Sequence, residues 1–333
     1  MIRSYPNGAS MGTAPRNSSH VRGKRGAVVG WSAGAARRNT RFLYSIEVDS
    51  LSGVGFALTL TLADIPVTAV EWGQLRRAWI KRVNRLGAVR LHWIVEWQRR
   101  GAPHLHVAVY FPESAVWGVV PGVVVDSYRV GVSSAPEGVQ PISGRAGSSD
   151  PSISTCFPVL AVAPRHSVST LGSRMVDDWL EISSRYRSGL SGQDCKPIDG
   201  VLGWLQYLGK HASRGAAHYQ RSGHPEGWEK TGRLWGHVGD WPEGEPMVFD
   251  LEPLAGVRFR RLVRSWRIAD ARKEVDRPTR ARRVLAARRM LRCTDRQLSP
   301  VRGVSEWLTQ DMTIALVIFL AAEGWKVTQR AVD

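Results

Sequence analysis

The clearest alternation of hydrophobic and polar positions lies between residues 56 and 62. Phe56, Leu58, Leu60 and Leu62 occupy the even positions, whereas one alanine and two threonines occupy the odd ones. Successive side chains of a strand point to opposite faces of its sheet. The pattern therefore predicts a strand with one face buried in a hydrophobic core.

A helical period follows this strand. Hydrophobic residues recur every three or four positions between Val70 and Leu86, and most basic residues of the segment lie off that stripe. This pattern predicts an amphipathic helix, which Gly87 ends. Two further strand patterns, at about Leu91–Gln98 and His104–Phe111, are separated by a short turn. The order strand, helix, strand, strand predicts a small α+β layout with an antiparallel hairpin.

The predicted hairpin carries polar residues on one parity. Its odd positions are hydrophobic and predict a core face, whereas Glu96, His104 and His106 share the even positions. If Glu96 lies opposite or diagonal to His104, the three side chains converge on the non-core face. Two imidazoles and a carboxylate are ligands for a divalent metal that keeps positions open for substrate oxygens. The same residues fit equally well as solvated or hydrogen-bonded side chains on an exposed face.

A second polar group follows a helical period between Asp199 and Arg214. Tyr207, Lys210 and Arg214 are spaced i, i+3 and i+7 and share a face beside an apolar stripe. A tyrosine beside two cations fits a nucleophile, because the cations favour the phenolate and neutralise a phosphate. The alternative is a tyrosine at the edge of the core with basic residues on the surface beside it.

The net charge of +17 is concentrated in two flanks of the chain. Residues 1–41 hold eight basic residues and no acidic one, and residues 258–302 hold sixteen basic residues against four acidic ones. Flanks of this kind suit binding to a nucleic-acid backbone without reading its sequence. For the N-terminal flank, a solvated arm is an equally good interpretation.

Composition divides the chain into three parts. Residues 1–41 predict a disordered basic arm, residues 42–250 a folded domain with a loop-rich insert at about 113–170, and residues 251–333 a basic, mostly helical region. Three widely spaced cysteines form no disulfide framework and suit a reducing compartment. The longest apolar run, Ile314–Ala322, is too short to span a bilayer and predicts a buried helix.

Several motifs in this order resemble the HUH endonucleases, and among them the single-tyrosine rolling-circle replication initiators of plasmids and small phages. The resemblance covers roughly residues 42–240. The tyrosine follows the histidine motif, whereas conjugative relaxases usually place it before. The matching segments are Leu58-Thr59-Leu60-Thr61, Glu96, His104-Leu105-His106, Tyr207-x-x-Lys210 and Gly232-Arg233-Leu234-Trp235-Gly236.

The resemblance implies an antiparallel sheet with helices packed on it, the HUH/RRM-like endonuclease core. It also implies metal-dependent nicking and rejoining of single-stranded DNA at a replication origin through a 5′-phosphotyrosine. In that role Tyr207 attacks phosphorus, and Lys210 positions the phosphate or helps the tyrosine ionise. Mg²⁺ or Mn²⁺ would be held by Glu96, His104 and His106, and DNA would be contacted by Thr59, Thr61, Arg214, Arg233 and Trp235.

Two features of the sequence refine this interpretation. His211 stands where two-tyrosine relatives carry their second tyrosine, so the resemblance implies a single nucleophile in this helix. No Gly-x-x-x-x-Gly-Lys-[Ser/Thr] loop is present, so a host helicase would unwind the DNA and a host polymerase would extend it. The expected location is the bacterial cytoplasm, with no membrane partner.

Three other functions fit parts of the same pattern. A single-tyrosine HUH transposase would share every motif, and a non-catalytic DNA-binding protein on the same fold would use Tyr207 only in packing. An RNA-binding α+β module is disfavoured, because the first strand offers Ala57, Thr59 and Thr61 where such modules expose aromatic side chains.

Overall fold

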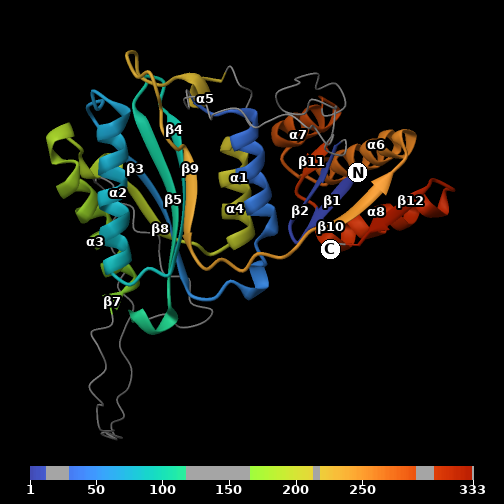
Figure 1. Cartoon of the computed structure of the whole chain (residues 1–333), viewed down its shortest axis with the longest axis horizontal. Helices are drawn as coiled ribbons and strands as arrows, with labels where there is room; N and C mark the ends of the chain where they lie inside the picture. Colours follow the sequence, from blue (N-terminus) through green and yellow to red (C-terminus); the bar gives the residue numbers. More distant parts are fainter. Residues whose placement is uncertain (13–29, 118–165, 213–217, 290–303, 332–333) are drawn as a thin grey trace, which may run out of the picture.

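The computed structural model describes residues 1–12, 30–117, 166–212, 218–289 and 304–331. Most of its strands form two five-stranded sheets, each with helices packed against it (Figure 1). Every strand pair within these two sheets is antiparallel. The fold is therefore α+β, as predicted. Most of the expected insert lies outside the described residues.

The central sheet has the strand order β8-β3-β5-β4-β9. In the β4–β5 hairpin, Glu96 lies opposite His104, which is one of the two registers that bring the predicted site together. On the other side of β5, Thr59 lies opposite His106. The predicted strands are confirmed, and the strands of the sheet are β3 (Val54–Thr61), β4 (Arg90–Trp97), β5 (Pro103–Phe111), β8 (Asp194–Pro197) and β9 (Trp235–Gly239).

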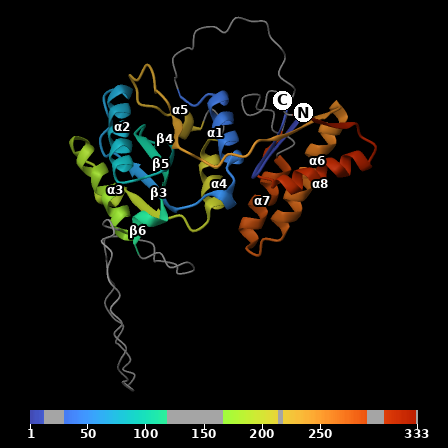
Figure 2. The ribbon, with the colours of Figure 1, turned by 60° about the horizontal axis from the view of Figure 1, so that its bottom comes forward.

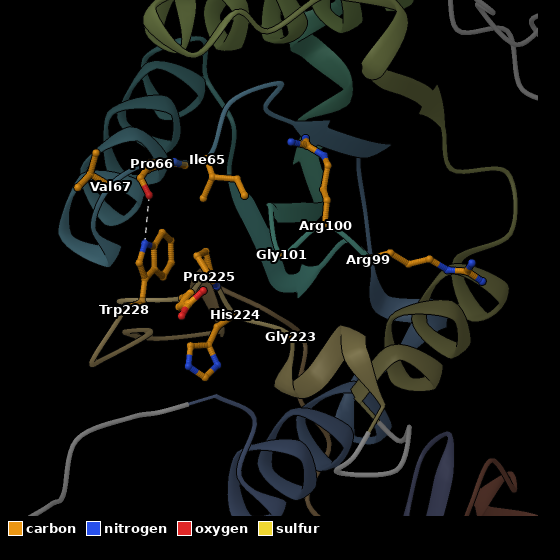
Figure 3. Close-up of a pocket in the computed structure, with 11 residues that line it drawn as sticks. Ile65, Pro66, Val67, Arg99, Arg100, Gly101, Gly223, His224, Pro225 and Trp228 are labelled. Carbon is orange, nitrogen blue, oxygen red and sulfur yellow. Dashed lines mark hydrogen bonds between the residues drawn. The ribbon is translucent and has the colours of Figure 1, made fainter.

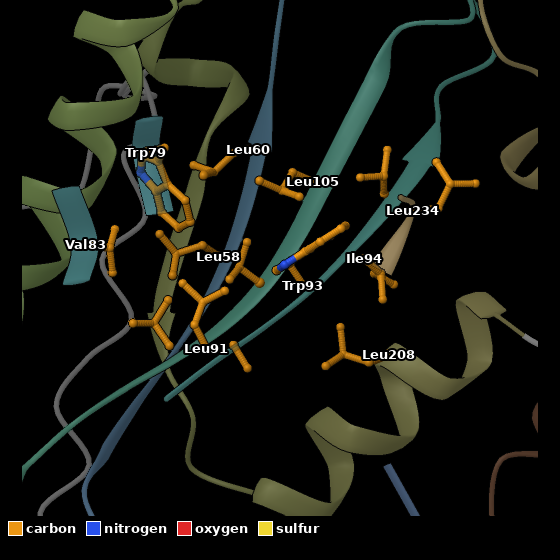
Figure 4. Packing of buried hydrophobic residues seen from close by; sticks show 14 of the residues in the cluster. Leu58, Leu60, Trp79, Val83, Leu91, Trp93, Ile94, Leu105, Leu208 and Leu234 are labelled. Carbon is orange, nitrogen blue, oxygen red and sulfur yellow. The ribbon is translucent and has the colours of Figure 1, made fainter. Parts of the chain in front are cut away.

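Helices α2 (Ala69–Arg85) and α3 (Val168–Ile182) cover one face of this sheet (Figures 1 and 2). The predicted helix corresponds to α2. The Thr68 hydroxyl caps its start by accepting a hydrogen bond from a backbone N–H of the first turn. Trp79 of α2 is fully buried, and its indole N–H donates to the Met175 carbonyl of α3 at 2.9 Å. Large hydrophobic side chains from both helices and from the odd positions of the hairpin fill this core. Figure 4 shows Trp79 and Val83 of α2 with Trp93 of the hairpin among the buried side chains.

Helices α1 (Ala33–Ser45) and α4 (Val201–Ala212) cover the opposite face (Figure 2). The Phe42 ring of α1 stacks on His92 with centroids 5.3 Å apart, and Leu208 of α4 is fully buried. The prediction of a non-core face is therefore wrong, since Ile94 and Ala108 on that parity are also buried. The polar residues there mark a polar site inside a covered face rather than contact with bulk water.

The second sheet has the order β11-β2-β1-β10-β12. Its core contains Ile2, Phe249, Phe259 and Leu316, all buried. Helix α7 (Arg277–Arg289) contacts α6. The sheet and the two helices that supply its core are β1 (Ile2–Tyr5), β2 (Gly8–Met11), β10 (Met247–Leu251), β11 (Val304–Glu306), β12 (Val327–Arg330), α6 (Pro253–Arg272) and α8 (Gln310–Ala322).

The expectation of a disordered arm at residues 1–41 is wrong where the structure describes that segment. Strand β1 pairs with both β2 and β10 and so lies inside the second sheet. Helix α1 begins at Ala33, and the Ser32 hydroxyl accepts from the Ala35 N–H at 3.1 Å. One partner of β1, strand β10, lies more than 240 positions away in sequence, so no local pattern predicted that pairing. Residues 13–29 lie outside the described part.

The C-terminal region is mostly helical, as predicted, but it also contributes β11 and β12 to the second sheet. The apolar run forms most of α8, as predicted, although only one side of that helix is buried. Leu316 and Leu320 are buried, whereas Ile318 is 62% exposed. Among the described helices, none combines the length and hydropathy that crossing a membrane requires.

A tryptophan joins the second sheet to helix α4. The Trp307 ring, just beyond β11, meets the Tyr44 ring of α1 edge to face with centroids 4.7 Å apart. A Cβ atom on Gly209 of α4 would lie only 2.8 Å from the same indole. Glycine at this position therefore allows the close approach. The remaining short elements are β6 (Val116–Trp117), β7 (His166–Ser167) and α5 (Tyr219–Ser222).

Candidate functional site

Three predicted metal ligands meet at the end of the β4–β5 hairpin, against α4 and α5. Glu96 and His106 are 2% and 3% exposed, and His104 is half-buried. The His106 Nε2 atom lies 3.6 Å from Glu96 Oε2, and the His104 and His106 rings are 4.4 Å apart between centroids. The hairpin register thus brings together the residues whose shared parity the sequence revealed.

Neighbouring side chains hold each of these three groups in place. Thr59 Oγ1 lies 3.1 Å from His106 Nδ1, so His106 presents its Nε2 atom toward Glu96. Gln98 Nε2 lies 3.2 Å from His104 Nδ1, and Gln220 Nε2 donates to Glu96 Oε2 at 3.0 Å. Contacts of this kind fix the orientation of histidines and carboxylates in metal sites.

The spacing of Glu96 and His106 can be compared with that of ligands on one cation. Two ligand atoms that each lie about 2.1 Å from an ion are about 3.0 Å apart at right angles and about 4.2 Å apart when opposite. The observed 3.6 Å falls between these limits. In the described part of the chain, no group of three or more such side chains is close enough to hold a metal ion as it stands. The spacing of Glu96 and His106 fits two ligands of one divalent cation, and the His104 side chain, whose ring lies beside His106, would have to move to become a third ligand.

Tyr207 of α4 lies against this group. Its ring meets the His106 ring edge to face with centroids 5.5 Å apart, and it stacks on Trp204 at 5.0 Å. The side chain is 37% exposed, so a substrate has access to it. Among the tyrosines that the structure describes, only Tyr207 and Tyr219 are exposed. The structure thus juxtaposes the two sequence motifs, which are about 100 residues apart.

The other predicted site residues have different surroundings. The Thr59 hydroxyl contacts His106, and the Thr61 hydroxyl donates to the Gly192 carbonyl, so both threonines already have partners inside the protein. Arg233 is exposed, and Trp235 is half-buried, with its ring 6.3 Å from that of Phe42. Lys210 belongs to α4, but its side chain and all of Arg214 lie outside the described part.

Sequence reasoning missed the glutamines of this site. Gln98 ends the predicted strand at the parity of Glu96, which is a signal that the alternation contained. Gln220 belongs to α5, a single turn that begins after residues outside the described part. No periodicity links that turn to Glu96, 124 positions earlier, so only the tertiary structure identifies it.

A second buried histidine lies on the same face as the candidate site. His92 is fully buried and hydrogen-bonded to Asn39 at 2.8 Å, and burial lowers the pKa of His92 to about 3. It is therefore neutral at physiological pH. Its contacts with Phe42 and Asn39 give it a packing role under α1 rather than a place among the metal ligands.

Comparison with known proteins gives the chain its family. A protein of Xylella fastidiosa (strain 9a5c), provisionally named a replication protein, is 41% identical over 337 residues, which span 98% of this chain and 99% of the relative. A replication-associated protein of Pseudomonas phage Pf3 is 33% identical over 330 residues, which span 98% of each protein. The chain belongs to this family of replication proteins.

A further member of the replication-protein family, from Xylella fastidiosa strain Temecula1, is 42% identical over 316 residues, or 92% of this chain. These alignments span both sheets, so the family likeness includes the second sheet as well as the one that carries the candidate site. No family model and no solved structure matches the chain.

Proposed function

We propose that the chain is a replication initiator of the HUH endonuclease type, which nicks and rejoins single-stranded DNA at a replication origin through Tyr207. The observation that carries this proposal is the contact of the Tyr207 ring with His106, beside Glu96 and His104. An exposed tyrosine next to a carboxylate and two imidazoles suits phosphoryl transfer to a protein side chain. The nuclease unit in this proposal is the central sheet with its covering helices.

The residues divide the reaction between them. The Tyr207 phenolate oxygen attacks phosphorus, the bond from phosphorus to the 3′ oxygen breaks, and the departing oxygen takes a proton to become a 3′-OH. The products are a 5′-phosphotyrosine and a primer end, and the reverse attack rejoins the strand without ATP. Glu96, His104 and His106 would hold Mg²⁺ or Mn²⁺, whose charge, when bound, polarises the scissile phosphate. Lys210, on the same helix as Tyr207, positions the phosphate or favours the phenolate.

The positive charge of the chain suits such a substrate. Arg233 is exposed near the sheet, and α6 and α7 carry most of the charge of the second basic flank. Phosphate contacts of this kind bind DNA without reading its sequence. Because the sequence lacks a nucleotide-binding loop for a helicase, host helicase and polymerase complete the proposed reaction sequence.

Two alternatives are distinguished by separate observations. The names of the relatives favour replication over transposition, which would use the same motifs. A non-catalytic DNA-binding protein would have no use for an exposed tyrosine against a buried imidazole that itself lies beside a buried carboxylate. The experiment below separates that alternative from the nuclease.

The test uses the full chain with Mn²⁺ and end-labelled single-stranded oligonucleotides that tile the element encoding it. We expect a labelled protein band on a denaturing gel that requires the metal. The band disappears in Tyr207→Phe and in His104→Ala. Tyr219→Phe is the matched control, because Tyr219 is exposed to the same degree, and it retains the band.

Two outcomes contradict the proposal. DNA binding without any labelled band, across oligonucleotides that span the whole element, supports the non-catalytic alternative. A band that persists in Tyr207→Phe but is lost in Tyr219→Phe assigns the nucleophile to α5 rather than α4.

A further inference from the structure

A pocket of about 610 Å³ lies beside the tip of the β4–β5 hairpin (Figure 3). Three segments line it: the loop at 65–67, the turn at 99–101, and the stretch at 223–228. Its volume is within the range of small-molecule sites in proteins. We call it the hairpin-tip pocket.

The segments that line the pocket also hold the candidate site. Arg100 Nε donates to Gln98 Oε1 at 2.9 Å, and Gln98 in turn contacts His104. The stretch at 223–228 directly follows α5, whose Gln220 donates to Glu96. The hairpin-tip pocket and the candidate metal ligands therefore share the hairpin tip, and His104 is only three residues from Gly101.

The walls of the pocket are fixed before any ligand binds. The Trp228 indole N–H donates to the Pro66 carbonyl at 3.0 Å, and this bond ties the 223–228 stretch to the 65–67 loop (Figure 3). The Arg100 guanidinium also donates to the carbonyls of Leu62 and Ala63. Gly101 has a φ of +85°, and a Cβ there would meet the Gly223 carbonyl at 3.5 Å. A preformed wall reduces the ordering entropy that binding must overcome.

The lining of the pocket combines an apolar surface with charged side chains of both signs, the arginines of the turn and the exposed carboxylate of Glu226. Val67 is 80% exposed and Ile65 36% exposed, although both are hydrophobic. The two arginines of the turn have different environments. Arg100 is bonded to three protein groups, whereas Arg99 is exposed, lies over the Tyr219 ring at 5.8 Å and forms no ion pair with any described residue. Figure 3 shows the Arg99 side chain extending away from the turn. An apolar surface suits a nucleobase, and an exposed cation on the other side of the turn suits a phosphate farther along the same strand.

We propose that the hairpin-tip pocket binds one nucleotide of the DNA single strand beside the phosphate that Tyr207 attacks. The base packs on Ile65 and Val67, and a phosphate farther along the strand pairs with Arg99. This inference rests on the proposed function, because that function supplies the single strand. The pocket would therefore bind a nucleotide that flanks the nick.

The first test measures binding of the full chain to a fluorescein-labelled single-stranded oligonucleotide, chosen as the tightest binder from the encoding element. An abasic site is moved along the oligonucleotide one position at a time. We expect one position to weaken binding of the wild-type chain by about fivefold, because the base at that position buries apolar surface against Ile65 and Val67. In the Val67→Asp variant, we expect the oligonucleotide with this abasic site to bind as tightly as the intact one.

The matched control is Val275→Asp, which makes the same change of charge at a valine that is 91% exposed and outside the pocket. It retains the wild-type response to the abasic site. Both valines are exposed, so neither substitution disturbs a core, and circular dichroism verifies that each variant is folded.

The second test measures the dependence of binding on salt concentration. Arg99→Ala is expected to reduce the slope of log K against log salt by about 0.7, the loss of one single-strand phosphate contact. Arg85→Ala is the control, because Arg85 is an exposed arginine at the end of α2 without an ion pair to any described residue. A purely structural role for Arg99 would alter stability but not this slope.

The inference is overturned if the abasic site weakens Val67→Asp as much as the wild type, or if Arg99→Ala and Arg85→Ala have equal salt slopes. Failure of the proposed function looks different. If the wild-type chain shows the expected abasic and salt effects but forms no covalent band, the pocket proposal stands and the nuclease proposal is contradicted. If the wild-type chain forms the covalent band but both pocket variants behave like their controls, only the pocket proposal is contradicted.

Discussion

The two sheets of this protein have the same number of strands but are built in different ways. The central sheet takes its strands from residues 54–111 and 194–239, and helices cover both of its faces. The second sheet combines strands from the two ends of the chain, none longer than five residues. Both sheets pair segments more than 130 positions apart, but only the second sheet joins the two ends of the chain, and the central sheet holds the candidate site.

The two sheets also differ in how far their polar and charged side chains are buried. In the central sheet, Glu96 and His106 are buried within a face that α1 and α4 cover, and Tyr207 lies at the edge of that cover. Burial strengthens electrostatic interactions, so a site in such a place suits chemistry on a charged substrate. The arginines of α6 and α7 beside the second sheet are mostly exposed, a placement that suits contact with an extended polyanion.

The largest expected effect tests whether the sheets are separable. Phe259→Ala removes a fully buried ring from the core of the second sheet and should lower the free energy of unfolding by about 3–5 kcal/mol. Because Phe259 belongs to the second core and not to the first, we expect the covalent band to persist well below the unfolding temperature. Denaturant unfolding and the gel assay measure the two effects.

Trp266→Ala is the control for that prediction, since Trp266 is on the same helix and 36% exposed, and it should cost less stability. Loss of the covalent band in folded Phe259→Ala protein would mean that the second sheet supports the site, with Trp307 against Gly209 as the contact that transmits the effect.

A smaller effect is expected from removing the Thr59 hydroxyl, which contacts the candidate metal ligand His106. Thr59→Val keeps the shape of the side chain but removes the contact with His106 Nδ1. Loss of such an orienting contact typically weakens a metal site by about 10–100-fold. We expect the Mn²⁺ concentration for half-maximal band formation to rise by that factor. Thr313→Val removes a buried hydroxyl from the second sheet's helix α8 and should leave this concentration unchanged.

The smallest effect is a dependence of stability on pH. Burial lowers the pKa of His92 in the folded chain to about 3, whereas an unfolded histidine titrates near 6.5. Between these values the unfolded state binds one more proton, so stability rises with pH by about 1.4 kcal/mol per unit and falls as the solution is acidified below about 6.5. Unfolding of the wild type and His92→Gln at several pH values measures this slope. An equal slope in both proteins would assign it to other groups.

The central part of the fold was readable from local patterns. The parity of β3, β4 and β5 predicted the strands and the convergence of Glu96 with His104 and His106, because side-chain alternation is a local property of a strand. The helical period predicted α2 in the same way. The sequence did not show whether the opposite face of the sheet is exposed or covered. That depends on helices from distant segments of the chain, which pack on the half-polar strands.

The sequence by itself determined the elements of the central sheet, the residues that share a face, the two basic flanks and the order of the motifs. Only the tertiary structure decided that Tyr207 meets His106, that Gln220 bonds to Glu96, and that residues 2–11 belong to a sheet rather than an arm. The physical reason is that periodicity reports which face a residue shares with its near neighbours. Contacts between segments 100 or more residues apart depend instead on how the whole chain packs.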